Sequence, residues 1–168
     1  MERGAVARKA AMERAGVGPG QIGTGARGKV INTGPRDRYL GRVAAMEAGL
    51  PETVPAMNVN RLCGSGRQAI VSVVQSLMLG DAQFGLAGGA ANMSRSPFIL
   101  PQARWGATMG DVKSLAMMLG PLNCPLGTRP IGATAETVPA EPHIPPQDPD
   151  ALALASPSPA PRPPAAAS

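Results

Sequence analysis

Aromatic residues are scarce in this sequence. Tyr39, Phe84, Phe98 and Trp105 are the only four among 168 residues. A chain of this length forms a single domain by default and can bury a sizeable core. With so few aromatic rings, that core must be built from aliphatic side chains and from some of the nine methionines.

Cysteine and long apolar runs are equally scarce. Cys63 and Cys124 are the only cysteines, too few for the disulfide framework of a small secreted protein. The N-terminal residues lack the apolar core of a signal peptide, and no stretch approaches the ~20 apolar residues of a membrane span. We therefore expect a cytoplasmic chain that makes no contact with a membrane.

A clustered positive charge is also lacking. The net charge of +5 comes mainly from arginines scattered along the chain. A nucleic-acid-binding face would need basic residues grouped together, with aromatic residues or a known motif beside them. We therefore predict no nucleic-acid partner and interpret the charge as a solvated surface, with an anionic cofactor as the alternative.

One stretch places a cysteine at the start of a helix. A β-prone run over 54–59 leads to Cys63, and an apolar segment follows that ends near Gly80. The positive end of the helix macrodipole favours a thiolate there, and Gly64 and Gly66 allow a substrate close to the backbone. Cys63 is thus a candidate nucleophile whose backbone N–H would stabilise an oxyanion. The alternative is a small buried hydrophobic residue.

The surroundings of Cys63 resemble those of the thiolases, in particular bacterial acetoacetyl-CoA and β-ketoacyl-CoA thiolases. The resemblance covers roughly residues 4–156 and corresponds to the N-terminal half of such an enzyme. It is carried by Ile31-Asn32-Thr33, Pro35-Arg36-Asp37, Gly41-Arg42-Val43-Ala44-Ala45, Asn60-Arg61-Leu62-Cys63-Gly64-Ser65-Gly66, Leu79-Gly80-Asp81-Ala82, Ala87-Gly88-Gly89, Asn92-Met93-Ser94, Leu100-Pro101-Gln102-Ala103-Arg104-Trp105-Gly106 and Met109-Gly110-Asp111.

The resemblance implies an α/β fold: the N-terminal half of the layered thiolase architecture, with a mixed sheet flanked by helices. Residues 1–112 would be the N-terminal domain without its first strand, and 113–138 part of the loop domain. In thiolases the loop domain shapes the acyl pocket and contributes to coenzyme A binding. Residues 139–168 are rich in proline and alanine, so we expect a disordered tail with no regular helix.

Local patterns give the elements of the N-terminal domain. We expect helices over 5–15 and 36–48, with Arg36, Asp37, Arg38 and Arg42 solvated at the surface, and a strand over 84–87. Residues 23–28 match GxGxxG, but a turn-rich stretch precedes them and a β-like segment, 29–31, follows. A dinucleotide site needs a strand before the match and a helix that begins at it, so we predict none there. The poor strand formers at 25–27 should weaken the sheet.

The helix after Cys63 is apolar on nearly every side, which is typical of a buried helix. Arg67 is the exception, because a buried guanidinium without a partner is unfavourable. If nothing covers one face, Ile70, Val74 and Met78 would form an apolar patch that favours self-association.

By resemblance, the chemistry would be acyl transfer between coenzyme A thioesters through an acyl-enzyme on Cys63, with no metal and no bound cofactor. The complete enzyme also uses a histidine and a second cysteine from its C-terminal half, and those motifs are absent from this sequence. His143, the only histidine, matches no catalytic position, and we interpret Cys124 as incidental.

Two functions therefore stand side by side. The chain is a thiolase-type acyltransferase acting on acyl-CoA, as a homo-oligomer or with a C-terminal thiolase half. Alternatively, it is an inactive truncated fragment or an interaction module. A ketoacyl synthase would share the layered fold and a cysteine nucleophile, but Cys63-Gly64-Ser65-Gly66 with Met109-Gly110-Asp111 favours a thiolase.

Overall fold

The computed structural model describes residues 2–127, 129–137, 145 and 147–156. It divides into two units, residues 1–121 and 122–168. Cys63 and the sheet belong to the first unit.

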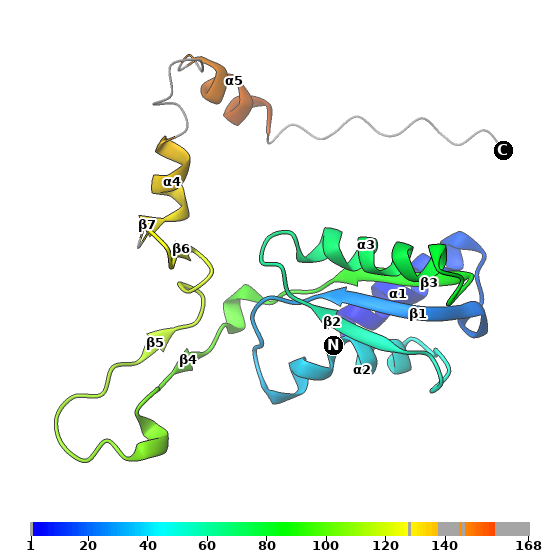
Figure 1. Cartoon of the computed structure of the whole chain (residues 1–168), viewed down its shortest axis with the longest axis horizontal. Helices are drawn as coiled ribbons and strands as arrows, with labels where there is room; N and C mark the ends of the chain where they lie inside the picture. The colour runs from blue at the N-terminus through cyan, green and yellow to red at the C-terminus, as the bar shows by residue number, and fades with distance from the viewer. Residues whose placement is uncertain (1, 128, 138–144, 146, 157–168) are drawn as a thin grey trace. The chain divides into compact units, whose positions relative to one another are not determined.

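A three-stranded parallel sheet forms the centre of the first unit (Figure 1). The middle strand, β1 (Ile22–Gly28), pairs with β2 (Ala56–Val59) on one side and β3 (Phe84–Gly89) on the other. The predicted α/β fold is confirmed, but the sheet contains only parallel pairs where we expected a mixed one. Antiparallel pairing occurs in two separate short ladders, formed by β4 (Phe98–Ile99) with β5 (Leu115–Ala116) and by β6 (Asn123–Cys124) with β7 (Arg129–Pro130).

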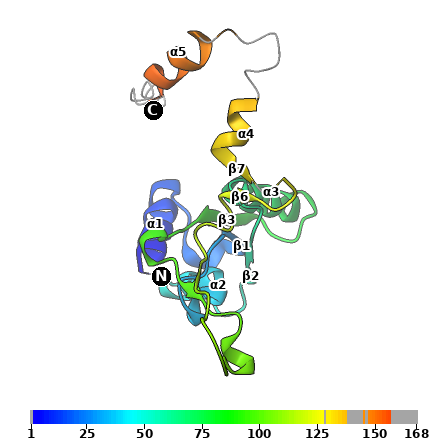
Figure 2. The ribbon, with the colours of Figure 1, turned by 90° about the vertical axis from the view of Figure 1, so that its left-hand side faces the viewer.

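Helices cover both faces of this sheet (Figures 1 and 2). The helices α1 (Glu2–Ala15) and α2 (Leu40–Glu47) lie on one face, and α3 (Ser65–Met78) lies on the other. Short 3₁₀ turns punctuate the connections: η1 (Pro19–Gln21), η2 (Pro35–Tyr39), η3 (Met93–Arg95) and η4 (Ala103–Trp105).

The buried side chains form two aliphatic clusters, as the shortage of aromatic residues requires. The smaller cluster joins the sheet to α3 and contains Ala26, Ala69 and Val73. The larger cluster holds α1 and α2 together with the sheet; its buried members are Met12, Ile22, Ala45, Ala48, Leu50, Val54 and Leu86.

The GxGxxG match forms the central strand itself. Residues 22–28 are extended, whereas the segment 29–31, expected to be β-like, lies beyond the strand. Glycine is needed at the end of this strand, beside the start of α3. A Cβ on Gly28 would lie 2.7 Å from the carbonyl carbon of Ser65. Tertiary packing has therefore overridden the poor strand propensity of these residues.

Two arginines are buried side by side on the α1 face of the sheet. Arg8 in α1 and Arg27 in β1 are each only 3% exposed. Arg27 donates from both Nη atoms to the carbonyl of Gly4 (3.1 Å each), and Arg8 donates from Nη1 to the carbonyl of Gly41 (2.8 Å). Arg8 Nη2 and Arg27 Nε have no hydrogen-bond partner in the described part of the chain. Burial, with a smaller contribution from Arg27, lowers the pKa of Arg8 to about 10.

The predicted second helix is divided into η2 and α2, and its polar residues are only partly solvated. Arg36 and Arg38 are exposed as expected. Asp37 instead pairs with Lys29 (3.1 Å), and Arg42 donates to the carbonyls of Glu52 and Val54 (2.6 Å each). The prediction of surface solvation was therefore wrong for Asp37 and Arg42, because both tie this segment to neighbouring loops.

Only one face of α3 is buried, contrary to the expectation of a helix enclosed on nearly every side. Its buried residues are Ser65, Ala69 and Val73, and Arg67 is exposed, so no guanidinium is buried on this helix. The outward face is the apolar patch considered in the sequence analysis. It contains the exposed side chains of Ile70, Val71, Val74 and Met78.

In its described residues, the second unit contains the helices α4 (Ile131–Thr137) and α5 (Gln147–Ala155). The helix α5 lies in the segment where proline was expected to prevent any regular helix. Its only proline, Pro149, lies in the first turn, where proline is tolerated, and alanine and leucine follow it. The expected disorder of residues 157–168 lies outside the described residues.

Across the described residues, we find no helix that combines the length and apolarity needed to cross a membrane.

Candidate functional site

Cys63 lies on an exposed turn between β2 and α3. The strand ends at Val59 and the helix begins at Ser65, with Gly64 as its N-cap. Cys63 therefore precedes the cap rather than belonging to the first turn of the helix, and its exposure contradicts the alternative of a buried hydrophobic residue. The turn follows the carboxyl end of a parallel strand, the edge where α/β sheets commonly bind ligands.

The backbone of this turn is unusual at the residue before the cysteine. Leu62 has φ of 46°, the only positive φ of a non-glycine residue among the described residues. Its N–H donates to Asn60 Oδ1 (3.0 Å). Its carbonyl accepts from Ser65 Oγ (2.5 Å) and from the Ser65 N–H (3.0 Å). A left-handed leucine persists only where its surroundings fix it, and such residues cluster at functional sites.

The turn is also joined to the central strand. Ser65 is buried, and its hydroxyl accepts from the Arg61 N–H (2.8 Å). The end of β1 passes so close to the start of α3 that only glycine fits at position 28. The sheet, the turn and the helix are therefore packed directly against one another behind Cys63.

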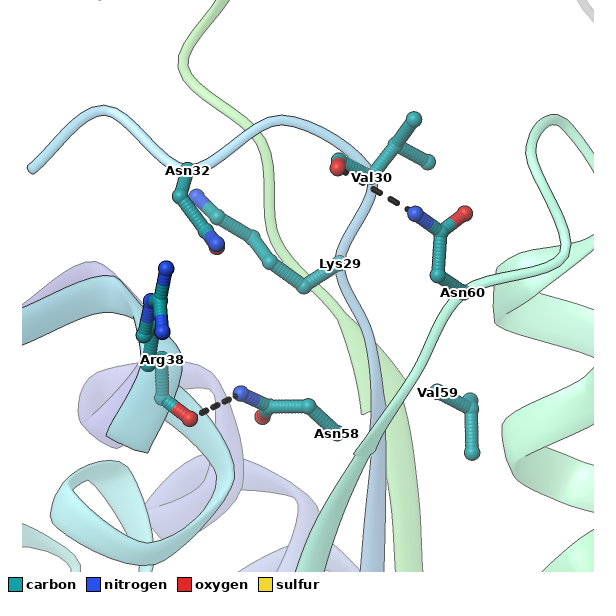
Figure 3. Close-up of a pocket in the computed structure, with 7 residues that line it drawn as sticks. All are labelled: Lys29, Val30, Asn32, Arg38, Asn58, Val59 and Asn60. Atoms are coloured by element: carbon teal, nitrogen blue, oxygen red, sulfur yellow. Dashed lines mark hydrogen bonds between the residues drawn. The ribbon is translucent and has the colours of Figure 1, made fainter. Parts of the chain in front are cut away.

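A small polar pocket lies at the carboxyl ends of β1 and β2 (Figure 3). Its volume is about 240 Å³. Asn60 donates to the carbonyl of Val30 (3.3 Å) and Asn58 to that of Arg38 (2.7 Å), the two contacts drawn in Figure 3. The pocket is lined by Lys29, Val30, Asn32, Arg38, Asn58, Val59 and Asn60.

A larger cavity of about 580 Å³ lies beside the Lys29–Asp37 ion pair. Burial alone would raise the pKa of Asp37, but hydrogen bonds from the Thr33 hydroxyl and N–H (2.7 Å each) and the Lys29 ammonium outweigh it and lower the pKa to about 2. Asp37 thus carries its charge throughout the physiological range and neutralises Lys29. Gly4 and residues 90–95 complete the wall.

The two motif segments after residue 99 meet around a third hollow. Residues from 101–106 and from 107–111 line a volume of about 310 Å³, with Trp105 and Met109 among them. Both side chains are largely exposed, at 84% and 97%. The two motif segments therefore line one hollow of the first unit.

Neither Cys124 nor His143 lies in the described part of the first unit. Cys124 lies in β6, in the second unit, and is half-buried. His143 lies outside the described residues. No group of three or more potential metal ligands occurs in the described part of the chain. Asn60 and Ser65 belong to the family motif, but the sequence indicates no role for them. Their contacts with Leu62 depend on a turn that no periodicity predicts.

The chain matches known proteins along nearly its whole length. The family model described as the thiolase N-terminal domain matches residues 2–167. The chain is 50% identical over 140 residues to the beta-ketothiolase BktB of Cupriavidus necator, covering 83% of this chain and 36% of that protein. It is 46% identical over 118 residues to an acetyl-CoA acetyltransferase of the same organism, covering 70% of this chain and 30% of that protein.

A solved structure gives the same picture. Human mitochondrial 3-ketoacyl-CoA thiolase, in complex with CoA, superimposes with a TM-score of 0.84 at 31% identity, covering 90% of this chain and 39% of that one. The chain therefore spans about a third of the length of the relatives it matches.

Proposed function

This chain belongs to the thiolase family, and on that premise we propose that it supplies the nucleophilic half of a thiolase-type acyltransferase. Cys63 would attack the carbonyl of an acyl-CoA thioester. The new bond joins Cys63 Sγ to the acyl carbon, the bond between that carbon and the coenzyme A sulfur breaks, and coenzyme A leaves as the thiol. The observation that carries this proposal is the exposed Cys63 on a fixed turn at the carboxyl edge of the sheet.

The names of these relatives support the substrate class. BktB is a beta-ketothiolase, the second relative is an acetyl-CoA acetyltransferase, and the human structure holds CoA. For this chain we therefore propose a coenzyme A thioester as substrate, with the hollow around Trp105 and Met109 as the place to look for contacts with it.

Steady turnover should require a positioned general acid and base in addition to Cys63. No histidine is among the described residues. A positioned general acid or base contributes roughly 10²–10⁴-fold to the rate. We therefore propose that the chain acts with a C-terminal thiolase half and that alone it accepts an acyl group slowly at most.

Acetyl transfer from acetyl-CoA is the test. The intact chain is incubated with acetyl-CoA and analysed by mass spectrometry with peptide mapping, with Cys63→Ser as the matched variant. The proposal predicts one acetyl group on the peptide containing Cys63, none on the variant and no steady release of product. Absence of the adduct, or its location on Cys124, would refute Cys63 as the acyl acceptor.

A second candidate function is an interaction module without catalysis. The observation in its favour is the outward face of α3, where Ile70, Val71, Val74 and Met78 are exposed together. Exposed apolar patches of several hundred Å² usually mark interaction sites or aggregation-prone surfaces. The acetylation experiment separates the two candidates, since an inert module would bind partners and leave Cys63 unmodified.

A further inference from the structure

The left-handed backbone of Leu62 must be stabilised from outside the residue. A side chain with a Cβ is disfavoured at positive φ, because the Cβ approaches the following carbonyl oxygen. Left to itself, Leu62 would relax to negative φ and carry the next residue, Cys63, with it. The direction of the Cys63 N–H and side chain therefore depends on whatever holds Leu62 at 46°.

Two side chains hold the peptide groups on both sides of this residue. Asn60 Oδ1 accepts from the Leu62 N–H (3.0 Å), and Ser65 Oγ donates to the Leu62 carbonyl (2.5 Å). The Ser65 hydroxyl also accepts from the Arg61 N–H (2.8 Å). One amide and one hydroxyl thus fix the turn at its two ends.

Both side chains are in turn anchored to the sheet. Asn60 Nδ2 donates to the carbonyl of Val30, just beyond β1 (3.3 Å, Figure 3). Ser65 is 4% exposed, and its backbone is packed against Gly28 at the end of the same strand. The turn therefore takes its geometry from the central strand rather than from flexible loop residues.

We propose that Asn60 and Ser65 are positioning residues that hold Leu62 in the left-handed conformation and so fix the presentation of the Cys63 thiol. Neither side chain is required to touch a substrate. The proposal deepens the acyl-transfer function, but its test uses a reaction of the thiol that needs no coenzyme A.

The experiment compares the iodoacetamide alkylation rate of Cys63 in the full chain across matched variants. Asn60→Ala removes the acceptor for the Leu62 N–H and should lower the rate about tenfold, the factor expected when a backbone preference of about 1.4 kcal/mol is no longer opposed. Leu62→Gly should rescue it, because glycine adopts positive φ without penalty. Asn58→Ala is the control, since Asn58 bonds the α2 region and not Leu62.

The rescue distinguishes positioning from a general loss of stability. If Asn60 were merely structural, Cys63 would be alkylated no faster in the double variant Asn60→Ala/Leu62→Gly than in Asn60→Ala. That outcome overturns the proposal, and so does an alkylation rate in Asn60→Ala equal to that of wild type. The urea midpoint reports on folding in each variant. If Asn60→Ala does not fold, Ser65→Ala with and without Leu62→Gly tests the opposite end of the turn with the same expected loss and rescue.

Acetylation by acetyl-CoA is measured in parallel. Rapid alkylation of Cys63 that depends on Asn60, together with no acetylation, would support the positioning of the thiol and refute the acyl-transfer function. Acetylation of Cys63 at the same rate in wild type and Asn60→Ala would support the acyl-transfer function and refute the positioning role of Asn60.

Discussion

Replacing Arg27 by methionine should stabilise this protein. Arg27 lies in the middle strand of the sheet at 3% exposure, beside the equally buried Arg8, and Lys29–Asp37 is the only ion pair among the described residues. Burial lowers the pKa of both guanidinium groups, which shows that the fold disfavours their charged forms. Methionine has a similar length, is flexible enough to fill the same space and carries no charge.

The expected gain follows from two opposing effects. Replacing a buried ion pair by well-packed apolar side chains often stabilises a protein by about 1–4 kcal/mol, and the unpaired guanidinium of Arg27 lacks even the attraction of an opposite charge. The two contacts of Arg27 with the Gly4 carbonyl are lost at a cost of about 1 kcal/mol. We expect a net gain of about 2 kcal/mol, and a Tm about 5–10 °C higher.

Urea unfolding followed by circular dichroism, with Arg36→Met as the control, measures this difference. Arg36 is exposed, so its replacement should change the free energy of unfolding by no more than about 0.5 kcal/mol. In Arg27→Met the midpoint should rise at constant m-value. The pKa of Arg8 should rise in part, because one neighbouring charge has gone while burial, the larger cause, still lowers it. A lower midpoint than wild type would mean that the guanidinium is a net stabilising bridge between α1 and the sheet.

Two further predictions concern association and acid stability. The chain should self-associate through the outward face of α3, so Val74→Lys should shift size-exclusion and light-scattering profiles toward the monomer; a wild-type chain that is already a clean monomer would contradict this. Asp37 has its pKa lowered to about 2 in the folded state, so its ion pair stabilises the fold fully above about pH 4 and loses that contribution as the pH falls toward 2. Thermal melts of wild type and Asp37→Asn should therefore converge as the pH falls from 4 to 2, and a constant difference in Tm across that range would refute the assignment.

Sequence periodicity predicted the order of elements well because local signals were strong. The helices around residues 5–15 and 65–78 have marked ends at Gly16 and Gly80, both with positive φ in the structure. The central strand had only a weak local signal. Its glycines and Arg27 are poor strand formers, so the sequence indicated β structure at 29–31, whereas pairing on both sides with β2 and β3 extends residues 22–28.

The sequence indicated Cys63 as the candidate nucleophile but not the residues that support its turn. A cysteine between a β-prone run and an apolar segment, followed by small residues, pointed to Cys63 from local sequence. The contacts that hold it join Asn60 to Val30 and Ser65 to Gly28, residues 30 and more positions apart. Arg42 was missed for a similar reason. The helical pattern predicts a solvated side chain, but Arg42 donates to the carbonyls of Glu52 and Val54 in a neighbouring loop.

We infer that the fold makes Cys63 the more reactive of the two thiols. Iodoacetamide labelling of the native chain, resolved by peptide mapping and repeated in denaturant, measures both rates. Cys63 should be labelled faster than the half-buried Cys124 in the folded chain, and the two rates should converge once the chain is unfolded. Labelling of Cys124 at an equal or higher rate in the folded chain would show that Cys63 is not the reactive thiol.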